Sequence, residues 1–365
     1  MSVSVKKGEH MTSIDKLREF LPDRHTAALV TSDINIRYFT LFPDSEGALL
    51  VTSDACWLLV DFRYYEKAQG VVSDEITLVQ FKKLFDSINS ILEKRDIKRL
   101  LIEEEEVTLS RFEKFKSELH AELLTEYKLS KIISDIRVIK TDREIELLTQ
   151  AQRIAEKAYT EVLNYIKPGV EERKIALELE YLMKQYGAER IAFDFITVSG
   201  KKTSMPHGSP DRNIIREGDF FTSDIGAVYE GYHSDMTRTV AVSYATDQMR
   251  EIYDIVLKAH EKAAQKIVVG NTTADVDLAA RDYITEKGYG EYFGHSTGHG
   301  VGLVIHEAPT VYKAYDTVLR HNMVITDEPG IYLPSEFGVR IEDMYVVRDE
   351  GSYTLAEIDK NLIIV

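Results

Sequence analysis

The stretch HSTGHGVGLVIHEAP, from His295 to Pro309, places three histidines among three glycines. So dense a group of imidazoles is unusual for a segment that only fills a core. Three interpretations are open at this point: a zinc-protease helix, a nucleotide-binding loop, or one wall of a larger site whose other residues lie elsewhere in the chain.

The first two interpretations fail on the residues themselves. A zinc-protease helix needs His-Glu-x-x-His, but Thr310 stands where the second histidine belongs, and Pro309 opposes a continuing helix. A dinucleotide fingerprint needs a third glycine where Leu303 stands, and the Gly-Lys-Ser/Thr of a P-loop is missing. What remains is an extended segment whose glycines allow a close backbone approach, with imidazoles directed at a site.

Outward from this stretch, a strand-rich block places two acids beside a turn. In TSDIGAVYEGYHSDMTRT (222–239), Asp224 and Asp235 flank the turn residues Glu230-Gly231. A hairpin there would bring the two carboxylates together, where they repel each other unless a cation neutralises them. The alternative is that both aspartates are exposed turn residues.

A second block, ITDEPGIYLPSEFGVRIEDMYVV (325–347), repeats the pattern. Glu328 and Glu342 flank a turn region at 334–338, and Arg340 lies two residues before Glu342, on the same strand face. Four carboxylates and one imidazole suit two divalent ions that share ligands. Because the donors are mainly oxygens, Mn²⁺ or a similar ion fits better than a thiolate-type zinc site.

Composition excludes several classes of partner. The 365 residues carry 45 basic and 61 acidic side chains, a net charge of −16, which argues against nucleic acid or an anionic membrane as a partner. No apolar run approaches the roughly 18 residues of a membrane helix, and the N-terminal MSVSVKKGEHM does not resemble a signal peptide. The single cysteine, Cys56, excludes an intramolecular disulfide, so we expect a reducing, cytoplasmic compartment.

Hydrophobic periodicity predicts that the N-terminal third is an α/β domain with a mixed sheet. Residues 26–30, 47–53, 55–60 and 98–104 are rich in strand formers, and 81–94 has helical spacing. The acidic run Glu103–Glu106 is interpreted as a solvated strand end, because four consecutive residues do not converge on one ion.

The rest of the chain alternates helices with strand pairs. A capping box at Thr141 and Glu144 opens a helix, and further helices are expected over 171–186, 247–268 and 275–287. Two blocks of helices, each followed by a strand pair, indicate a duplicated architecture. The expected boundaries are 12–132 for the first domain, 133–140 for a linker and 141–365 for the second domain.

Taken together, these segments resemble the pita-bread metallopeptidases, the family of methionine aminopeptidase, Xaa-Pro aminopeptidase, prolidase and creatinase. The resemblance rests on SMPHGSP around His207, the two aspartates, HSTGHGVGLVIHEAP, EPGIY and GVRIED. NIRYFTLF (35–42) and LLVDFRYYEKA (58–68) resemble the creatinase-type N-terminal domain. The family implies an α/β (α+β) chain whose C-terminal pita-bread domain has pseudo-twofold helix and hairpin halves.

The resemblance also implies the metal ligands. Asp224 would bind one ion, Asp235 and Glu342 would bridge both, and His299 and Glu328 would complete the other. The implied cofactor is a pair of divalent ions, with Mn²⁺ first and Co²⁺ or Zn²⁺ as alternatives.

Further positions would serve the substrate. His207 and His306 would face the scissile bond, His295 would line the pocket, and Arg340 would orient the carboxylates. Glu328 is a candidate proton shuttle as well as a ligand. The remaining histidines match no motif, and surface or packing roles are expected for them: His10, His25, His120, His233, His260 and His321.

Three positions depart from the family pattern. Leu41 and Ser296 stand where relatives carry glycine, and Asp327 stands where they carry an apolar or neutral residue. Ser296 and Asp327 could change the pocket shape or the electrostatics of the metal site.

The implied activity is metal-dependent hydrolysis by an Xaa-Pro aminopeptidase, with an Xaa-Pro dipeptidase (prolidase) as the alternative. A creatinase-like hydrolase or a non-catalytic binding protein fits less well, because all five ligand positions are intact. Short proline-containing peptides are the expected substrates, and a homodimer is the family expectation.

Overall fold

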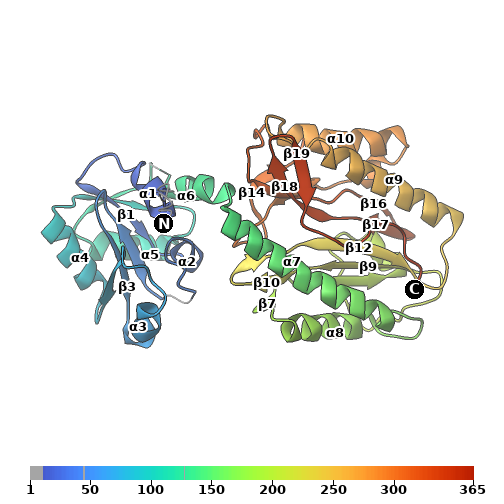
Figure 1. The fold of residues 1–365 in the computed structure, drawn as a ribbon, viewed down its shortest axis with the longest axis horizontal. Coiled ribbons are helices and arrows are strands. Elements are labelled where there is room, and N and C mark those ends of the chain that lie inside the picture. Colours follow the sequence, from blue (N-terminus) through green and yellow to red (C-terminus); the bar gives the residue numbers. More distant parts are fainter. Residues whose placement is uncertain (1–10, 44–45, 127) are drawn as a thin grey trace, which may run out of the picture. The chain divides into compact units, whose positions relative to one another are not determined.

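The computed structural model describes residues 11–43, 46–126 and 128–365, and the chain divides into two units between Arg137 and Val138 (Figure 1). The predicted linker, 133–140, lies mostly within helix α6, Leu129–Val138, rather than in a loop. Ile133 and Ile136 are buried at helical spacing, which accounts for the helix at this junction.

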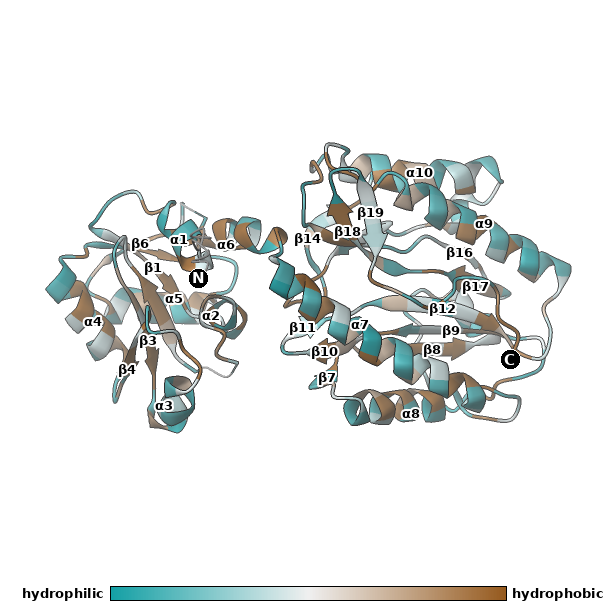
Figure 2. Cartoon of the chain, in the orientation of Figure 1, coloured by the Kyte–Doolittle hydropathy of each residue, from teal (hydrophilic) through white to brown (hydrophobic). Residues whose placement is uncertain are grey.

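The described residues of the first unit form a six-stranded sheet with the order β4-β3-β2-β1-β5-β6. β1 pairs antiparallel with β2 and parallel with β5, so the predicted mixed α/β domain is confirmed. Figure 2 shows that its strands are mostly hydrophobic. The strands are Thr26–Val30, Ala48–Val51, Cys56–Val60, Thr77–Gln80, Arg99–Ile102 and Glu122–Leu124; the helices α1 to α5 are Ser13–Arg18, Asp33–Thr40, Phe62–Gln69, Leu84–Arg95 and Leu109–Glu118.

Glu103 is not the solvated strand end that the sequence indicated. It is fully buried, and its carboxylate accepts hydrogen bonds from the backbone of Thr31 and Ser32 and from Nδ2 of Asn35, the last at 2.7 Å. The prediction was wrong for this residue because a buried carboxylate that accepts several hydrogen bonds can hold two segments together. The following three glutamates are partly or fully exposed.

Leu41 caps helix α2 in the left-handed conformation, with φ at 60°. That conformation favours glycine, which gives a physical reason why glycine suits this position. The side chain is 73% exposed.

The second unit begins with helix α7, Asp142–Val162. The predicted capping box is confirmed, because the Thr141 side chain and that of Glu144 each accept a backbone N–H of the other residue. The next α-helices are α8, Glu172–Gln185, α9, Asp247–Ala264, and α10, Thr273–Glu286, with short 3₁₀ helices at Leu163–Tyr165, Gly200–Ser204 and Gly290–Tyr292. The predicted helices are therefore present, and α9 ends earlier than its predicted bound.

The strands of this unit form two halves. The first half contains two three-stranded sheets, with the orders β12-β9-β8 and β11-β10-β7. The second half contains a five-stranded sheet, β14-β13-β15-β18-β19, and a two-stranded sheet, β16-β17. They are β7 Arg190–Ile191, β8 Ile196–Ser199, β9 Phe220–Ile225, β10 Ala227–Tyr229, β11 Tyr232–His233, β12 Met236–Ala241, β13 Gly298–Gly300, β14 Glu307–Val311, β15 Val324–Asp327, β16 Gly330–Leu333, β17 Phe337–Arg340, β18 Asp343–Arg348 and β19 Gly351–Thr354.

Two cores and one bridge define the duplicated architecture. Helices α7 and α8 share a core with β9 and β12, whereas α9 and α10 share one with β15, β17 and β18, so the helix pairs flank the strands (Figure 1). The halves meet where Thr237 pairs with Glu342. Among the described residues, every helix is too short or too polar to cross a membrane.

Candidate metal centre

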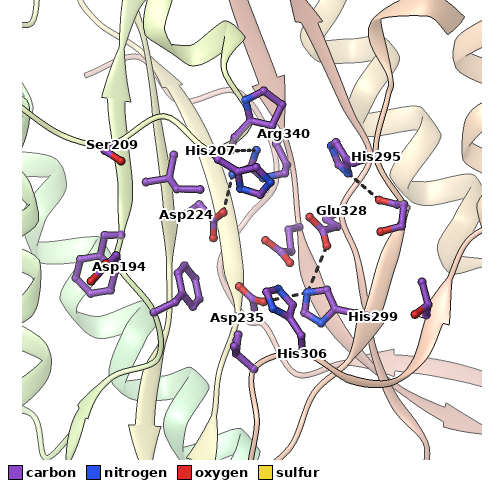
Figure 3. A pocket seen from close by; sticks show the side chains of 18 residues that line it. Asp194, His207, Ser209, Asp224, Asp235, His295, His299, His306, Glu328 and Arg340 are labelled. Carbon is purple, nitrogen blue, oxygen red and sulfur yellow. Dashed lines mark hydrogen bonds and ion pairs between the residues drawn. The ribbon is translucent and has the colours of Figure 1, made fainter. Parts of the chain in front are cut away.

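A cavity of about 520 Å³ opens between the two strand-rich halves of the second unit. All nine residues that the sequence singled out as ligands, catalytic groups or pocket residues line it (Figure 3). Phe193, Asp194, Phe195, Ser209 and Thr310 also contribute to its walls. The structure therefore gathers residues spread over more than a hundred positions of the chain into one cavity.

Both predicted turns that place the acids are present. At the first turn Glu230 and Gly231 have φ of 45° and 85°, and at the second Ser335 has φ of 64°. Asp224 lies on β9, directly opposite Thr237 of β12. Glu328 and Glu342 lie just outside the hairpin of β16 and β17.

Three side chains are close enough to share one ion. The ligating atoms of Asp235, His299 and Glu342 all lie within 4.8 Å of one another. Nε2 of His299 is 3.5 Å from Oδ2 of Asp235 and 3.4 Å from Oε1 of Glu328. Asp224 is held differently, because its Oδ2 accepts a 2.6 Å charge-assisted bond from Arg340.

The electrostatics of these acids fit a divalent cation. Burial, with the charges of Asp224 and Glu328, raises the pKa of Asp235 well above its usual value. Burial also raises the pKa of Glu342, reinforced by Asp235, and it raises the pKa of Glu328 to about 8. Several buried carboxylates that cannot all ionise without compensation are a donor set that a divalent ion would neutralise.

His299 fits the same ligand set. Burial lowers the pKa of His299 to about 4, which favours the neutral imidazole that metal ions bind. Its backbone N–H is fixed by Oγ1 of Thr326, at 3.0 Å.

Arg340 makes several hydrogen bonds on one side of the cavity. Besides Asp224, it donates to Oγ1 of Thr237 at 3.1 Å and to the hydroxyl of Tyr332 at 2.9 Å. Thr237 in turn donates to Oε2 of Glu342 at 2.6 Å. Sequence reasoning missed Tyr332 and Thr237, although alternation along Glu328, Gly330 and Tyr332 could have placed the tyrosine on the ligand side.

The three histidines of the opening stretch occupy different places. The rings of His299 and His306 meet edge to face, with centroids 4.4 Å apart. His295 lies farther along the wall, where its Nε2 is 2.8 Å from the Tyr332 hydroxyl. Burial lowers the pKa of His295 to about 4, whereas His207 is exposed at the cavity rim.

The glycines of the segment 295–309 allow neighbouring strands to approach closely. A Cβ on Gly298 would lie 2.0 Å from the carbonyl oxygen of Thr326, and one on Gly300 would lie 2.0 Å from that of Ala308. The close approach inferred from the sequence is therefore to the protein's own backbone, which brings β13 against β14 and β15.

The other described histidines lie outside the cavity lining. His233 is buried beside Gly302, with Nδ1 3.3 Å from its carbonyl oxygen, and His260 is buried on α9. His25, His120 and His321 lie beside surface acids: Asp96, Glu93 and Asp349. His10 falls outside the described residues.

Comparisons with known proteins give matches over both units of the chain. Residues 146–349 match the model of metallopeptidase family M24, and residues 14–139 match the creatinase/prolidase N-terminal domain. The solved Xaa-Pro dipeptidase from Bacillus anthracis is 40% identical, with a TM-score of 0.93, over 97% of this chain and 99% of that one.

Two further relatives carry related names. The X-Pro aminopeptidase from Thermotoga maritima MSB8 is 34% identical, with a TM-score of 0.89, over 96% of this chain and 100% of that one. The Xaa-Pro dipeptidase from Pyrococcus furiosus is 38% identical over 352 residues, which are 96% of this chain and 99% of that protein. The chain therefore belongs to metallopeptidase family M24 and carries a creatinase/prolidase N-terminal domain.

Proposed function

We propose that this peptidase hydrolyses the bond between an N-terminal residue and proline, with Xaa-Pro dipeptides as its main substrates. The observation that carries the proposal is the single cavity that gathers the five ligand candidates and three further histidines, His207, His295 and His306. The sequence favoured an aminopeptidase, with the dipeptidase as alternative. The relatives named Xaa-Pro dipeptidase, at 38–40% identity over nearly the whole chain, favour that alternative.

Family membership implies divalent metal ions, and we propose that this chain holds two. Asp224, Asp235, His299, Glu328 and Glu342 would hold them, with Mn²⁺ as the native ion and Co²⁺ or Zn²⁺ as substitutes. When bound, such ions lower the pKa of water and polarise the substrate carbonyl.

The chain's own groups would then position the substrate and move protons. His306, whose ring lies against that of His299, would stabilise the charge that develops on the carbonyl oxygen. Glu328 would carry a proton from the attacking water, and His207 would protonate the proline nitrogen as it leaves. The free amine of the substrate would lie beside Asp224, which limits hydrolysis to the first peptide bond.

One observation favours a second candidate, the Xaa-Pro aminopeptidase. Among the described cavity-lining residues, Arg340 is the only lysine or arginine, and its guanidinium is already paired with Asp224. The carboxylate of a dipeptide would therefore meet no unpaired lysine or arginine among the described lining residues. A longer peptide, whose proline carboxyl group is an amide, needs no such partner.

A peptide panel tests both candidates. Purified protein is loaded with Mn²⁺ and assayed on Ala-Pro, Ala-Pro-Ala and a longer Ala-Pro peptide, with Glu342→Gln as the inactive control. Hydrolysis of the dipeptide alone supports the dipeptidase, and hydrolysis of the longer peptides supports the aminopeptidase. Release of methionine before a residue other than proline, or no metal binding by the wild-type chain, would contradict both.

Two further properties belong to this proposal. We expect a homodimer, which sedimentation of the full chain would reveal, and a cytoplasmic location, for which the buried, unpaired Cys56 is the support.

A further inference from the structure

One carboxylate in the cavity has no part in the ligand set. Among the described acids that line the cavity, Asp194 alone is not a proposed ligand. Its side chain is exposed, and no other described residue makes an ion pair or hydrogen bond with its carboxylate. Phe193 and Phe195 line the cavity on either side of it in the chain.

The wall that carries Asp194 is fixed to the strand of Asp224. Ile196 of β8 lies directly opposite Asp224 of β9, and the backbone N–H of Ala192 donates to the carbonyl of Gly226 at 2.8 Å. A Cβ on Gly226 would lie 3.0 Å from the ring of Phe193. Asp194 therefore lies in a short segment between β7 and β8, which is anchored on the Asp224 side of the cavity at Ala192 and Ile196.

Figure 3 shows Asp194 and Ser209 across the cavity from His295 and His299. The amine of the substrate was assigned above to the Asp224 side, so the side chain of the N-terminal residue would extend toward Asp194. This step rests on the proposed function.

The side chains of Phe193, Asp194 and Phe195 suit a substrate side chain with an apolar chain and a cationic end. Among the described residues no lysine, arginine or histidine pairs with Asp194, so its charge is available to a cation of the substrate. Aromatic side chains accommodate the methylene stem of lysine or arginine, whose cationic end remains free to meet a carboxylate. An acidic side chain placed there would be repelled.

We propose that Asp194 is a specificity-determining residue that favours lysine or arginine as the residue before proline. It is a site for the substrate side chain, separate from the groups that bind metal ions or contact the scissile bond. The same carboxylate disfavours aspartate or glutamate in that position.

The test compares Lys-Pro with norleucine-Pro, whose side chains share a stem and differ in the ammonium group. The tripeptides Lys-Pro-Ala and norleucine-Pro-Ala are assayed in parallel, so that the result does not depend on dipeptidase or aminopeptidase preference. We expect the wild-type Mn²⁺-loaded enzyme to have a kcat/KM about three- to tenfold higher for the lysine peptide, because a partly exposed ion pair contributes only modestly. Asp194→Asn should bring the ratio close to one, and added salt should reduce the wild-type ratio.

The matched control is Asp282→Asn, which removes an exposed carboxylate from α10, outside the cavity lining. It should leave the ratio unchanged. If Asp194→Asn slows both peptides equally, Asp194 acts on a group that they share, such as the α-amine, and the proposal is wrong. If the wild-type enzyme cleaves norleucine-Pro and Lys-Pro equally well, the proposal is also wrong while the proposed function stands. Failure to cleave any Xaa-Pro peptide would instead overturn the proposed function, and this proposal with it.

Discussion

The two strand pairs that carry the carboxylates are supported from behind by different contacts. In the first half, the faces of β9 and β12 that point away from Asp224 carry mainly apolar residues, with one buried cation, Arg238, opposite Ser223. Phe221, Ile225, Met236 and Val240 are buried there in one core with α7 and α8. The first pair is thus held chiefly by packing, which depends on volume and shape.

In the second half, the corresponding faces carry charge. Asp327 of β15 lies directly opposite Asp343 of β18, and His260 of α9 has Nδ1 3.3 Å from Oδ2 of Asp327 and Nε2 3.4 Å from Oδ2 of Asp343. Arg238 and Lys360 each pair with Asp343 at 2.7 Å. Asp327 and Asp343 directly neighbour Glu328 and Glu342 in the chain, and Arg238 reaches this network from β12 of the first half. The second pair of ligands therefore depends on a balance of buried charges.

The largest effects are expected when the proposed metal ligands are replaced. Without metal, replacement of a ligand in the first half and in the second half should change the free energy of unfolding differently. Asp224→Asn and Glu342→Gln should each lower kcat/KM by about a thousandfold or more, because each removes a metal ligand. Without metal, Asp224→Asn should cost about 3 kcal/mol, since it removes the partner of the buried Arg340. Glu342→Gln should be neutral or stabilising, because it replaces a carboxyl group whose pKa is already raised by burial. Urea unfolding in EDTA measures both, and equal losses would contradict the contrast.

The raised pKa values also predict how the stability of the metal-free protein depends on pH. Burial raises the pKa of Glu328 in the folded protein to about 8, from 4.5 for the ordinary group. Between these values the folded state retains a proton that the unfolded chain releases, so stability falls as pH rises through this window. Urea unfolding at pH 5 and pH 8 in EDTA should show this loss, and saturating Mn²⁺ should reverse it. A metal-free protein that becomes more stable over the same range would disprove the assignment.

Short-range patterns allowed much of this organisation to be predicted from sequence. The capping box at Thr141, the turn at Glu230-Gly231 and the motif positions around His299 depend on neighbouring residues and a fixed spacing. The burial of Glu103 and the place of His260 beside Asp327, 67 residues away, were not predictable in the same way. They depend on which strands and helices pack together. Before that packing is known, a lone histidine or a run of acids is most simply predicted to lie on the surface.

Replacement of His260 tests whether the second half depends on charge. His260→Leu leaves Asp327 and Asp343 facing each other in a fully buried site, and we expect a loss of about 3–5 kcal/mol. Adding Asp327→Leu should recover part of that loss, because it removes the carboxylate left without a partner. Urea unfolding of the single and double variants measures the recovery. A double variant no more stable than His260→Leu would show that packing, rather than charge, supports this half as well.

Intermediate effects are expected at two partly buried ion pairs beside the segments of His207 and His306. Glu172 pairs with Lys202 at 2.6 Å in the first half, and Glu307, next to His306, pairs with Lys140 at 2.6 Å in the second. Lys202→Met and Lys140→Met should each lower kcat about tenfold, because a small misplacement of a catalytic group is costly.

Two measurements distinguish misplacement of a catalytic group from a general loss of structure at the metal site. Mn²⁺ affinity should stay within about twofold of wild type, because no ligand changes, and Lys140→Arg should restore most of the activity lost in Lys140→Met. The exposed Lys174→Met on α8 is the control for loss of a lysine. A loss of Mn²⁺ binding that parallels the loss of kcat would show that the pairs support the metal site instead.

The smallest effect is expected when a buried aliphatic side chain behind the strands is shortened. Matched substitutions in the two halves test whether apolar packing contributes equally to both. Ile225→Val in the first half and Ile325→Val in the second each remove one methylene group from a fully buried side chain. Each should cost about 1 kcal/mol and leave Mn²⁺ affinity unchanged. Ile325 lies on the same face of β15 as Asp327, opposite Tyr345. A markedly larger loss for Ile325→Val would mean that the buried charges of the second half tolerate no repacking, because a small shift of β15 would alter their distances.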